Sequence, residues 1–303
     1  MFMRQLVYLV ALDRHRHFAR AAEHCNVSQP ALSAGLSELE RELGITIVKR
    51  NRSFEGITPE GERVLAWAHQ VLASLDGLKQ EAALVRNVTG GHIRIGTIPS
   101  AVSPLSSLVS EYRRSFPGLT LEVMSLSTSE LHRRIKKGEL DLAIVYDDAE
   151  RDESFNYLPL LAERYVLLAH EARHLPPTLG WSEVAGLPLG LFSGEMHNRT
   201  IIDRIFRDVK ASPSIVLETN TVEILLSEVR SGALVSVLPQ GALPPDGLGH
   251  GVHIHAILPE RASSLGLVRL ERHVQPPLSE ALWKLSRALD PSLFASGGGA
   301  QSA

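Results

Sequence analysis

Residues 18–43 carry two apolar stripes at helical spacing, and this pattern constrains the fold more than any other segment of the chain. The first stripe recurs at i, i+3, i+4 and i+7 and consists of Phe18, Ala21, Ala22 and Cys25. After a short break, the second stripe consists of Leu32, Leu36, Leu39 and Leu43. Two short amphipathic helices joined by a tight turn predict a helix-turn-helix.

Local chemistry fixes the ends of the second helix. Ser28 can cap its N-terminus, and Pro30 fits the first turn because no intrahelical partner for its missing N–H exists there. Gly44 favours termination of the helix. The sequence therefore predicts a helix of about four turns between Ser28 and Gly44.

Opposite its leucine stripe, the second helix turns three short polar residues outward, namely Gln29, Ser33 and Ser37. A helix that displays such side chains near its N-terminus can enter a DNA major groove, where glutamine pairs with adenine edges and serine with several bases. An ordinary helical hairpin with a solvated serine face is the alternative. The spacing alone does not separate the two.

Two β-branched runs follow, at residues 45–50 and 54–58, and predict a hairpin whose tip is residues 51–53. A basic hairpin beside a recognition helix is a wing, and we expect it to place Lys49, Arg50 and Arg52 against phosphates or a narrow minor groove. Residues 1–60 hold eight basic and seven acidic residues, a net charge of only +1. Any attraction to DNA must therefore come from local placement of charge.

The segment from Phe2 to about Glu62 resembles the winged helix-turn-helix of LysR-type transcriptional regulators. The resemblance rests on Phe18, Ala21-Ala22 and residues 27–33 (VSQPALS), 39–44 (LERELG) and 58–62 (TPEGE). It implies DNA contacts from Ser28, Gln29, Pro30, Ser33, Ala34 and Ser37. The family usually has arginine at the position of Ala34 and phenylalanine at that of Val48, so this chain lacks the arginine that customarily contacts DNA in the family.

A long helix is predicted over residues 59–87, with Thr58 as its cap and Pro59 in its first turn. Apolar residues recur in it at alternating spacings of four and three: Val64, Ala68, Val71, Leu75, Leu78, Ala82 and Val85. This is a coiled-coil seam, and a length of roughly 40 Å favours a dimerisation helix over packing within one small domain. A symmetric dimer would read an inverted repeat in double-stranded DNA.

Residues 88–91 predict a hinge, and beyond them strands alternate with amphipathic helices, which indicates parallel sheets covered by helices. The expected class is a multidomain α+β and α/β chain. By resemblance to type 2 periplasmic binding proteins, residues 92–290 form a two-lobed effector domain, with lobe one at 92–162 and 266–290 and lobe two at 163–265. Residues 1–58 form the DNA-binding domain, and the low-complexity tail 291–303 is expected to be disordered.

Short polar residues lie where predicted strands end and helices begin, the usual place for a ligand in α/β sheets. The effector-binding candidates are Ser100, Ser127, Thr128, Tyr146, His197, Asn198, Arg199, Asn220 and Thr221. A plain helix cap is the alternative role for each hydroxyl or amide. The resemblance places effector-binding hydroxyls at Ser100 and Thr128, and a small carboxylate or other anion suits the set.

The single cysteine, a group of three histidines and the apolar start of the chain have structural interpretations. Cys25 lies on the apolar stripe, which indicates a buried structural thiol, and one cysteine supports no disulfide framework. His250, His253 and His255 could hold a transition metal, but without a clear fourth ligand a solvated edge strand is favoured, so we expect neither a metal nor a cofactor. The apolar start of the chain is too short to cross a bilayer and lacks a cleavage site, which indicates a cytoplasmic protein without a membrane partner.

These patterns predict a ligand-responsive transcription factor that acts as a homodimer or homotetramer and is not an enzyme. An exported solute-binding protein and an α/β enzyme acting on a small acid are the alternatives. Neither a signal sequence nor a convincing nucleophile and base supports them. Residues 52–68 resemble a LysR branch associated with formate dehydrogenase genes, and this resemblance implies formate or another small carboxylate as the effector.

Overall fold

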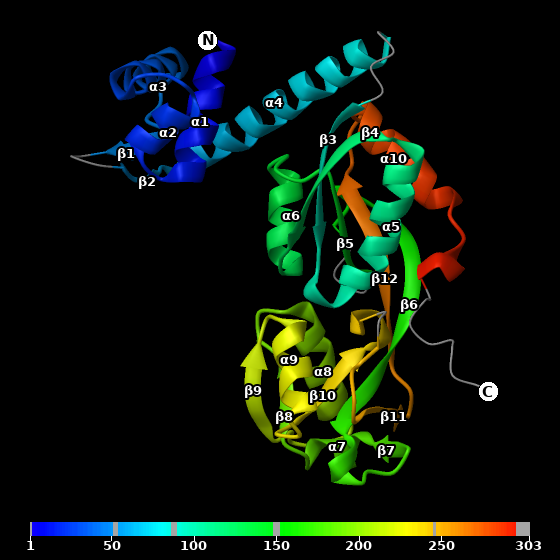
Figure 1. Cartoon of the computed structure of the whole chain (residues 1–303). Helices are drawn as coiled ribbons and strands as arrows, with labels where there is room; N and C mark the ends of the chain where they lie inside the picture. The colour runs from blue at the N-terminus through cyan, green and yellow to red at the C-terminus, as the bar shows by residue number, and fades with distance from the viewer. Residues whose placement is uncertain (1, 51–53, 86–89, 148–151, 245–246, 295–303) are drawn as a thin grey trace. The chain divides into compact units, whose positions relative to one another are not determined.

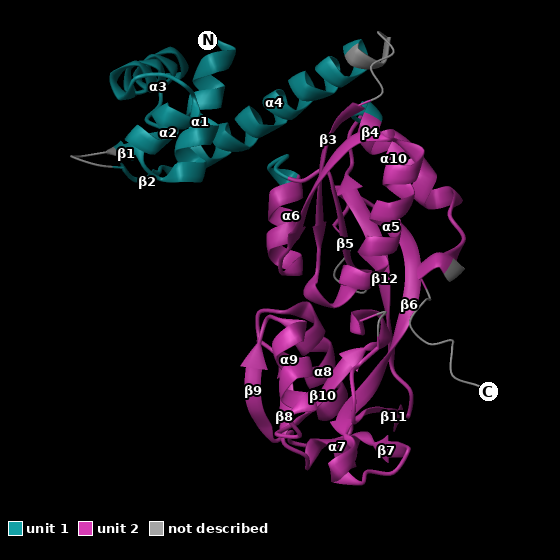
Figure 2. Cartoon of the chain, in the orientation of Figure 1, with its two compact units in different colours: residues 1–88, 136–139, 274–277 teal, residues 89–135, 140–273, 278–303 magenta. Residues whose placement is uncertain are grey.

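The computed structural model describes residues 2–50, 54–85, 90–147, 152–244 and 247–294. The chain divides into two compact units (Figure 2): unit 1 comprises residues 1–88 with the short segments 136–139 and 274–277, and unit 2 comprises the remainder. Of the predicted hinge 88–91, residues 88 and 89 lie outside the described residues, whereas Gly90 and Gly91 begin a strand. Of the predicted tail 291–303, residues 295–303 lie outside them, whereas Pro291–Phe294 form a 3₁₀ turn.

Unit 1 is built from short helices, a small hairpin and one long helix (Figure 1). In order they are α1 (Met3–His15), α2 (Phe18–His24), α3 (Gln29–Leu43), β1 (Val48–Arg50), β2 (Phe54–Ile57) and α4 (Pro59–Val85). The predicted helix ends are confirmed. The Ser28 hydroxyl accepts a hydrogen bond from the Ala31 N–H at 3.4 Å, Gly44 adopts φ 68°, and the Thr58 hydroxyl accepts from the Gly61 N–H at 2.9 Å.

The leucine stripe of α3 forms the centre of the unit 1 core, since Leu32, Leu36 and Leu39 are at most 1% exposed. The prediction was wrong for Leu43, which is 40% exposed. Leu43 lies in the last turn of the helix, where Gly44 directs the chain away, so the helical period overestimates the length of the buried face.

Gly35 allows α1 to approach α3 closely. A Cβ at this position would lie 2.9 Å from two ring carbons of Tyr8. A glycine inside a helix costs about 0.5–1 kcal/mol relative to alanine. The close packing of the Tyr8 ring on α3 offsets this cost, and it accounts for a residue that helix propensity alone disfavours.

Unit 2 alternates strands and helices. Its strands are β3 (Gly90–Thr97), β4 (Gly118–Ser125), β5 (Leu142–Tyr146), β6 (Phe155–His170), β7 (Thr178–Gly180), β8 (Leu189–Phe192), β9 (Ile215–Thr219), β10 (Val235–Pro239), β11 (Val252–Leu258) and β12 (Ala262–Leu270). Its α-helices are α5 (Val102–Ser115), α6 (Thr128–Lys136), α7 (Trp181–Ala185), α8 (His197–Asp208), α9 (Val222–Arg230) and α10 (Pro277–Ala288). Short 3₁₀ turns occur at Pro99–Ala101, Glu171–Arg173, Gln240–Ala242 and Pro291–Phe294.

The strands run in the order β4-β3-β5-β12-β6-β10-β8-β9, with β11 and β7 attached beside β6. β3 pairs in parallel with β4 and β5, and β8 pairs in parallel with β9 and β10. β12 and β6, however, pair antiparallel with each other and with their neighbours. The expected parallel pairing is therefore present in each lobe, and the two long strands β6 and β12 add antiparallel pairs in the middle of the unit.

The strands β6 and β12 join the two lobes of unit 2 (Figure 1). One hydrophobic core contains β3, β4 and β5 with α5, α6 and α10. Two further clusters pack β8 and β10 against α7, α8 and α9. The long strand β6 contributes Leu160 to the first core and Leu167 to the second, so one continuous strand is shared by both lobes.

Candidate functional site

The outward face of α3 is open to solvent at the positions predicted to read DNA. Ser33 is half-buried, while the other candidates are exposed, namely Ser28, Gln29, Pro30, Ala34 and Ser37. The Ser37 hydroxyl donates a hydrogen bond to the Ser33 carbonyl oxygen at 3.0 Å, which leaves its lone pairs toward solvent. A helix face with exposed polar side chains and a buried leucine stripe behind it has the geometry of a recognition helix.

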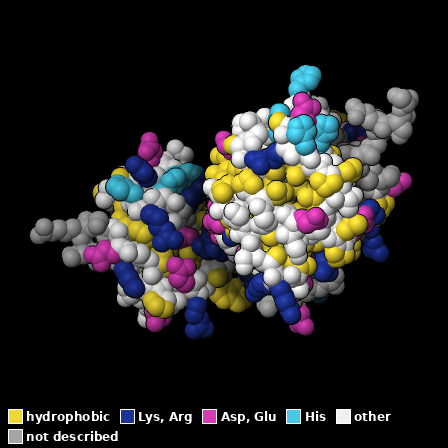
Figure 3. All heavy atoms as spheres, turned by 90° about the horizontal axis from the view of Figure 1, so that it is seen from below, with side chains coloured by type: hydrophobic (Ala, Val, Ile, Leu, Met, Phe, Trp, Pro, Cys, Tyr) yellow, Lys and Arg dark blue, Asp and Glu magenta, His cyan; other side chains and the backbone are white. Residues whose placement is uncertain are grey.

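The wing is an antiparallel pair in which Val48 lies opposite Ile57. Lys49 is exposed on it, whereas the side chain of Arg50 and the whole of Arg52 lie outside the described residues. On the face displayed in Figure 3, basic and acidic side chains of unit 1 are interspersed. This distribution agrees with the near-neutral charge of residues 1–60.

The long helix α4 exposes an apolar stripe that differs from the predicted seam. Ala68 is 1% exposed and belongs to the core of unit 1, so the prediction was wrong for this residue. Val64 also packs on that core, Leu75 is half-buried, and the side chain of Val85 lies outside the described residues. The exposed stripe consists of Trp67, Val71, Leu78 and Ala82.

Trp67 is the residue of this stripe that the heptad pattern missed. It is 68% exposed, and Leu78 is 66% exposed. At 100° per residue, Trp67, Val71 and Leu78 fall on one face of α4. An exposed tryptophan and an exposed leucine on the same helix face favour a protein contact, since large apolar side chains in water carry an unfavourable solvation free energy.

Unit 2 contains an inner pocket in which five of the predicted effector residues converge. Its lining is Ile98, Pro99, Ser100, Thr128, Tyr146, Phe192, Met196, His197 and Asn198. These residues come from both lobes, and the pocket has room for about one water-sized molecule. The pocket therefore suits a small ligand or one whose entry widens it.

Tyr146 is the centre of the hydrogen-bond network in this pocket. Its hydroxyl lies 2.9 Å from the Ser100 hydroxyl and accepts a hydrogen bond from the Asn198 side-chain amide, also at 2.9 Å. Tyr146 is fully buried, and burial raises its pKa well above the usual value. The phenol is therefore neutral at physiological pH and can both donate and accept.

Thr128 begins α6 and is 7% exposed. Its hydroxyl has no hydrogen-bond partner in the structure, although it lines the inner pocket. A buried hydroxyl without a partner loses the free energy of its hydrogen bonds to water. A ligand that hydrogen-bonds to Thr128 would recover that loss.

A second, wider cavity of ≈ 540 Å³ adjoins the inner pocket, since Pro99 and Met196 line both. Ser127, Asn220 and Thr221 lie there rather than in the inner pocket. Its lining also includes the carboxylates of Glu130, Glu195 and Glu223.

Glu130 carries its own counter-ions. Hydrogen bonds from Arg133 lower the pKa of its carboxyl to about 2, with Arg134 acting in the same direction. Glu130 is therefore ionised at any physiological pH. Arg133 and Arg134 offset its charge, so Glu195 and Glu223 are the carboxylates that make the approach to the inner pocket unfavourable for ligands of high negative charge.

Arg199 does not line either of these two cavities. Its guanidinium forms ion pairs with Asp203 at 2.8 Å and Glu218 at 2.6 Å and donates to the Phe192 carbonyl oxygen. The role of Arg199 in this structure is to tie α8 to β9. The His197 ring, by contrast, lies against the Tyr146 ring, with the ring centroids 5.5 Å apart and the ring planes tilted by 39°.

Sequence patterns missed Glu163, which lies on β6 where the strand passes between the lobes. It is 3% exposed, and burial raises the pKa of its carboxyl to about 8, although the Gly241 N–H and the Tyr146 hydroxyl act in the opposite direction. The sequence offers one indication of this site, because Glu163 is the only acidic residue in the largely apolar segment 160–168.

The three histidines near residue 250 do not converge. The Nδ1 atom of His255 lies 2.7 Å from the Pro176 carbonyl oxygen, while His253 is exposed and lies 3.5 Å from a Glu171 carboxylate oxygen. His250 is exposed. A shared metal among them has no support in this arrangement.

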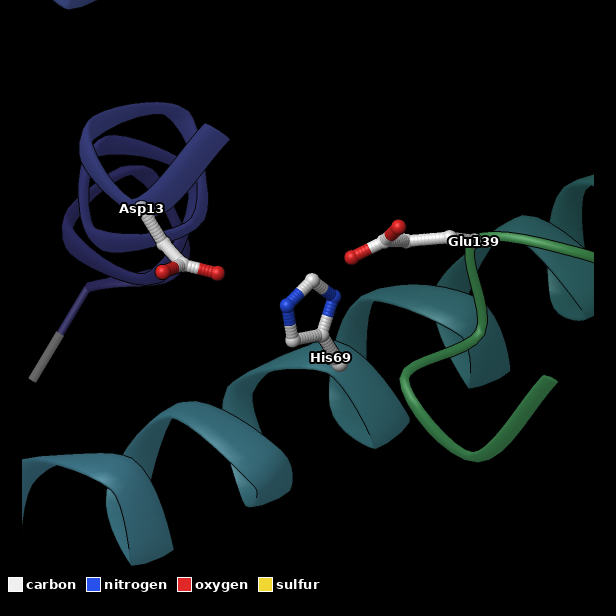
Figure 4. A group of neighbouring side chains, drawn as sticks. All are labelled: Asp13, His69 and Glu139. Atoms are coloured by element: carbon white, nitrogen blue, oxygen red, sulfur yellow. The ribbon is translucent and has the colours of Figure 1, made fainter. Parts of the chain in front are cut away.

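Unit 1 instead brings Asp13, His69 and Glu139 together, with ligand atoms within 4.8 Å of one another (Figure 4). Asp13, however, already pairs with two cations, Arg16 at 2.7 Å and Lys137 at 3.0 Å. These cations neutralise the carboxylate, so the cluster is best described as a buried ion-pair group.

The fold and these surfaces define a transcription factor with a DNA-reading helix and a separate ligand-binding domain. Residues 3–62 match the family of bacterial regulatory helix-turn-helix proteins of the LysR type, and residues 86–290 match the LysR substrate binding domain. The chain therefore belongs to the LysR family of DNA-binding transcriptional regulators and is not an enzyme. The predicted fold class is confirmed. Among the helices of the described residues, none has the length and hydropathy of a membrane span.

Among its relatives is the DNA-binding transcriptional dual regulator OxyR of Escherichia coli K12, with 30% identity over 88% of this chain and 89% of the relative. Among solved structures, a full-length cysteine-to-aspartate variant of OxyR from Pseudomonas aeruginosa has a TM-score of 0.74 at 25% identity and covers 96% of this chain and 99% of that one. CbnR in complex with its target DNA shares the fold, with a TM-score of 0.67 at 19% identity, covering 95% and 99% of the two chains.

Proposed function

We propose that this protein binds an inverted-repeat DNA site as a homodimer or homotetramer and responds to a small carboxylate, with formate as the first candidate. The observation that supports the ligand class is the inner pocket, where Ser100, Thr128 and Tyr146 of one lobe meet Asn198 of the other. Hydroxyl and amide groups that converge on one point provide hydrogen bonds to a carboxylate.

The charge around the pocket limits the ligand further. The described lining of the inner pocket contains neither lysine nor arginine, and the outer cavity carries acidic side chains. A dianion would meet repulsion without a compensating cation, whereas one negative charge can be held by hydrogen bonds. Small size and a single charge are both properties of formate and acetate.

Several relatives are named hydrogen peroxide-inducible genes activators, so a redox effector is the second candidate. The only cysteine of this sequence, Cys25, lies at the C-terminal end of α2 in unit 1, and burial raises the pKa of its thiol. A raised pKa disfavours the reactive thiolate. These facts favour a reversibly bound effector over thiol oxidation in the pocket.

Ligand binding would draw the two lobes together, because the inner pocket takes residues from both. In the proposed mechanism, this closure alters how the subunits associate and so changes the arrangement of the recognition helices on DNA. The effector must bind the two arrangements with different affinities for this to happen, and DNA must then alter effector affinity by the same factor.

Thr128→Val tests the assignment of the pocket. Valine has the shape of threonine without its hydroxyl, so we expect formate or acetate affinity to fall by roughly tenfold, the effect of about 1.4 kcal/mol, while DNA affinity without ligand is unchanged. Isothermal titration calorimetry with each sodium salt measures the first quantity, and fluorescence anisotropy with labelled operator DNA measures the second.

The matched control is Thr200→Val, a threonine of α8 that does not line the inner pocket. It should bind each carboxylate as the unmodified protein does. If Thr128→Val and Thr200→Val had the same affinity as the unmodified protein, the inner pocket would not be the carboxylate site.

A further inference from the structure

We infer that Glu163, acting through Tyr146 and Ser100, sets the hydrogen-bond polarity of the inner pocket and so selects an anionic ligand. This inference rests on the proposed function, because it assigns ligand selection at the same pocket to a residue that does not line it. The hydroxyl groups of Tyr146 and Ser100 lie between the buried acid and the ligand.

Glu163 does not line the inner pocket but interacts with Tyr146, which does. Its carboxyl faces the Tyr146 hydroxyl of β5 and the backbone of Gly241, where a Cβ would lie 2.3 Å from a carboxyl oxygen. Neither carboxyl oxygen has a hydrogen-bond partner among the described residues. A nearly unpartnered buried carboxyl favours its neutral form, because burial penalises the charge.

The surroundings of Glu163 contain no compensating cation in the described residues. Tyr146 on β5 and Gly241 in the turn at Gln240–Ala242 are the groups that act on its charge. Two other titratable groups adjoin this network: Tyr165, which follows on the same face of β6 and whose hydroxyl lies 3.0 Å from that of Ser263 on β12, and His197, whose ring centroid lies 5.5 Å from that of Tyr146. Phenols are neutral in this pH range, so the charge of the acid is decided mainly by burial.

When Glu163 is neutral, its acidic proton can be donated to the Tyr146 oxygen. That oxygen also accepts from the Asn198 amide, so both of its acceptor sites are used and its own hydrogen points to Ser100. The Ser100 hydroxyl then directs its hydrogen into the pocket. Together with the unpartnered Thr128 hydroxyl, the pocket offers two donors, which suits a carboxylate.

When Glu163 is ionised, every bond in this chain reverses. Tyr146 donates to the carboxylate, and Ser100 donates to the Tyr146 oxygen. Ser100 then presents only lone pairs to the pocket, and a negative charge lies behind it. Such a pocket repels a carboxylate, while a neutral amide, which can donate as well as accept, still binds.

Calorimetry at two pH values tests this inference without any substitution. Formate and acetate stay ionised throughout, and acetamide is the neutral probe of similar size. With a Glu163 pKa of about 8, roughly a tenth of the acid stays protonated at pH 9, so the carboxylate Kd should rise about tenfold between pH 6.5 and pH 9. The acetamide Kd should change less than threefold.

Glu163→Gln provides the second measurement. The glutamine amide donates to Tyr146 at every pH. The variant should therefore bind carboxylates at pH 9 with the same affinity as the unmodified protein has at pH 6.5. Glu260→Gln is the control, since Glu260 is an exposed carboxylate paired with Arg164. It should retain the full pH dependence.

The possible failures are distinguishable. The role assigned to Glu163 is wrong if the unmodified protein binds formate or acetate with the same affinity at both pH values. It is also wrong if the carboxylate affinity of Glu163→Gln falls at pH 9 as much as that of the unmodified protein. In either case the proposed ligand class stands. If neither carboxylate binds at pH 6.5, the proposed ligand class is wrong and the inference falls with it.

Discussion

Replacing Gln29 and Ser33 together with alanine should abolish sequence-specific DNA binding. Both residues lie in the N-terminal half of α3, with Gln29 exposed and Ser33 half-buried. A good bidentate contact between a side chain and a base contributes about 1–3 kcal/mol of discrimination, so we expect operator affinity to fall by roughly 100-fold or more for the pair. Fluorescence anisotropy with operator and scrambled duplexes at one fixed salt concentration measures the loss.

Two further readouts make this result specific to base recognition. Affinity for the scrambled duplex should change little, because phosphate contacts supply nonspecific binding. Formate or acetate affinity should also be unchanged, since the inner pocket belongs to unit 2. A control variant, Ser110→Ala on the exposed side of α5, should match the unmodified protein. Retained operator specificity in the double variant would refute the assignment of α3 as the recognition helix.

Replacing Leu78 with aspartate should dissociate the dimer. Leu78 is 66% exposed in the single chain and lies on the stripe that includes Trp67 and Val71. A symmetric helix pair would bury both copies of the new carboxylate without a cation, at a cost of several kcal/mol, so the dimer Kd should rise by roughly 100-fold or more. Sedimentation velocity across a protein dilution series measures the change.

The control for this variant is Asp76→Asn, on the side of α4 opposite the stripe, where Asp76 is 62% exposed. It changes the charge of the same helix by one unit and should leave the dimer intact. Loss of the dimer in Leu78→Asp should also lower operator affinity, because a single chain contacts only one half-site. An intact Leu78→Asp dimer would show that subunits associate elsewhere.

The DNA-binding part of this chain is largely predictable because its information is local. The Ser28 cap, the glycine at residue 44 and the leucine spacing act within a few residues of one another. The errors arise where tertiary contacts intervene. Ala68 follows the heptad pattern, but the core of unit 1 covers it, and the exposed stripe shifts toward Trp67. Periodicity cannot tell which of two neighbouring helix faces a domain will cover.

The effector domain is predictable in its elements and less so in its connections. The alternation of strands and helices follows from local patterns, but residues 155–164, the first half of β6, mix apolar, polar and proline residues and so lack a clear strand pattern. The antiparallel pairing of β6 with β12 joins segments about a hundred residues apart. Such pairing depends on long-range packing, which no short pattern contains.

Short sequence patterns also identify only part of the inner pocket. Hydroxyl residues after strands identify Ser100 and Thr128, because strand ends gather at one edge of a sheet. Glu163 could not be assigned a role in this way, since its partner Tyr146 lies on another strand and its neutral state depends on burial. Arg199 has a suitable charge for an anion, yet two carboxylates hold it away from the inner pocket.

The most direct test of the whole account is a hydroxyl-radical footprint of the unmodified protein on its operator, with and without saturating formate or acetate. The account predicts two protected half-sites separated by one helical turn or a multiple of it, with a ligand-dependent shift in the spacing or extent of protection. Identical footprints under both conditions with a carboxylate that calorimetry shows to be bound would contradict it.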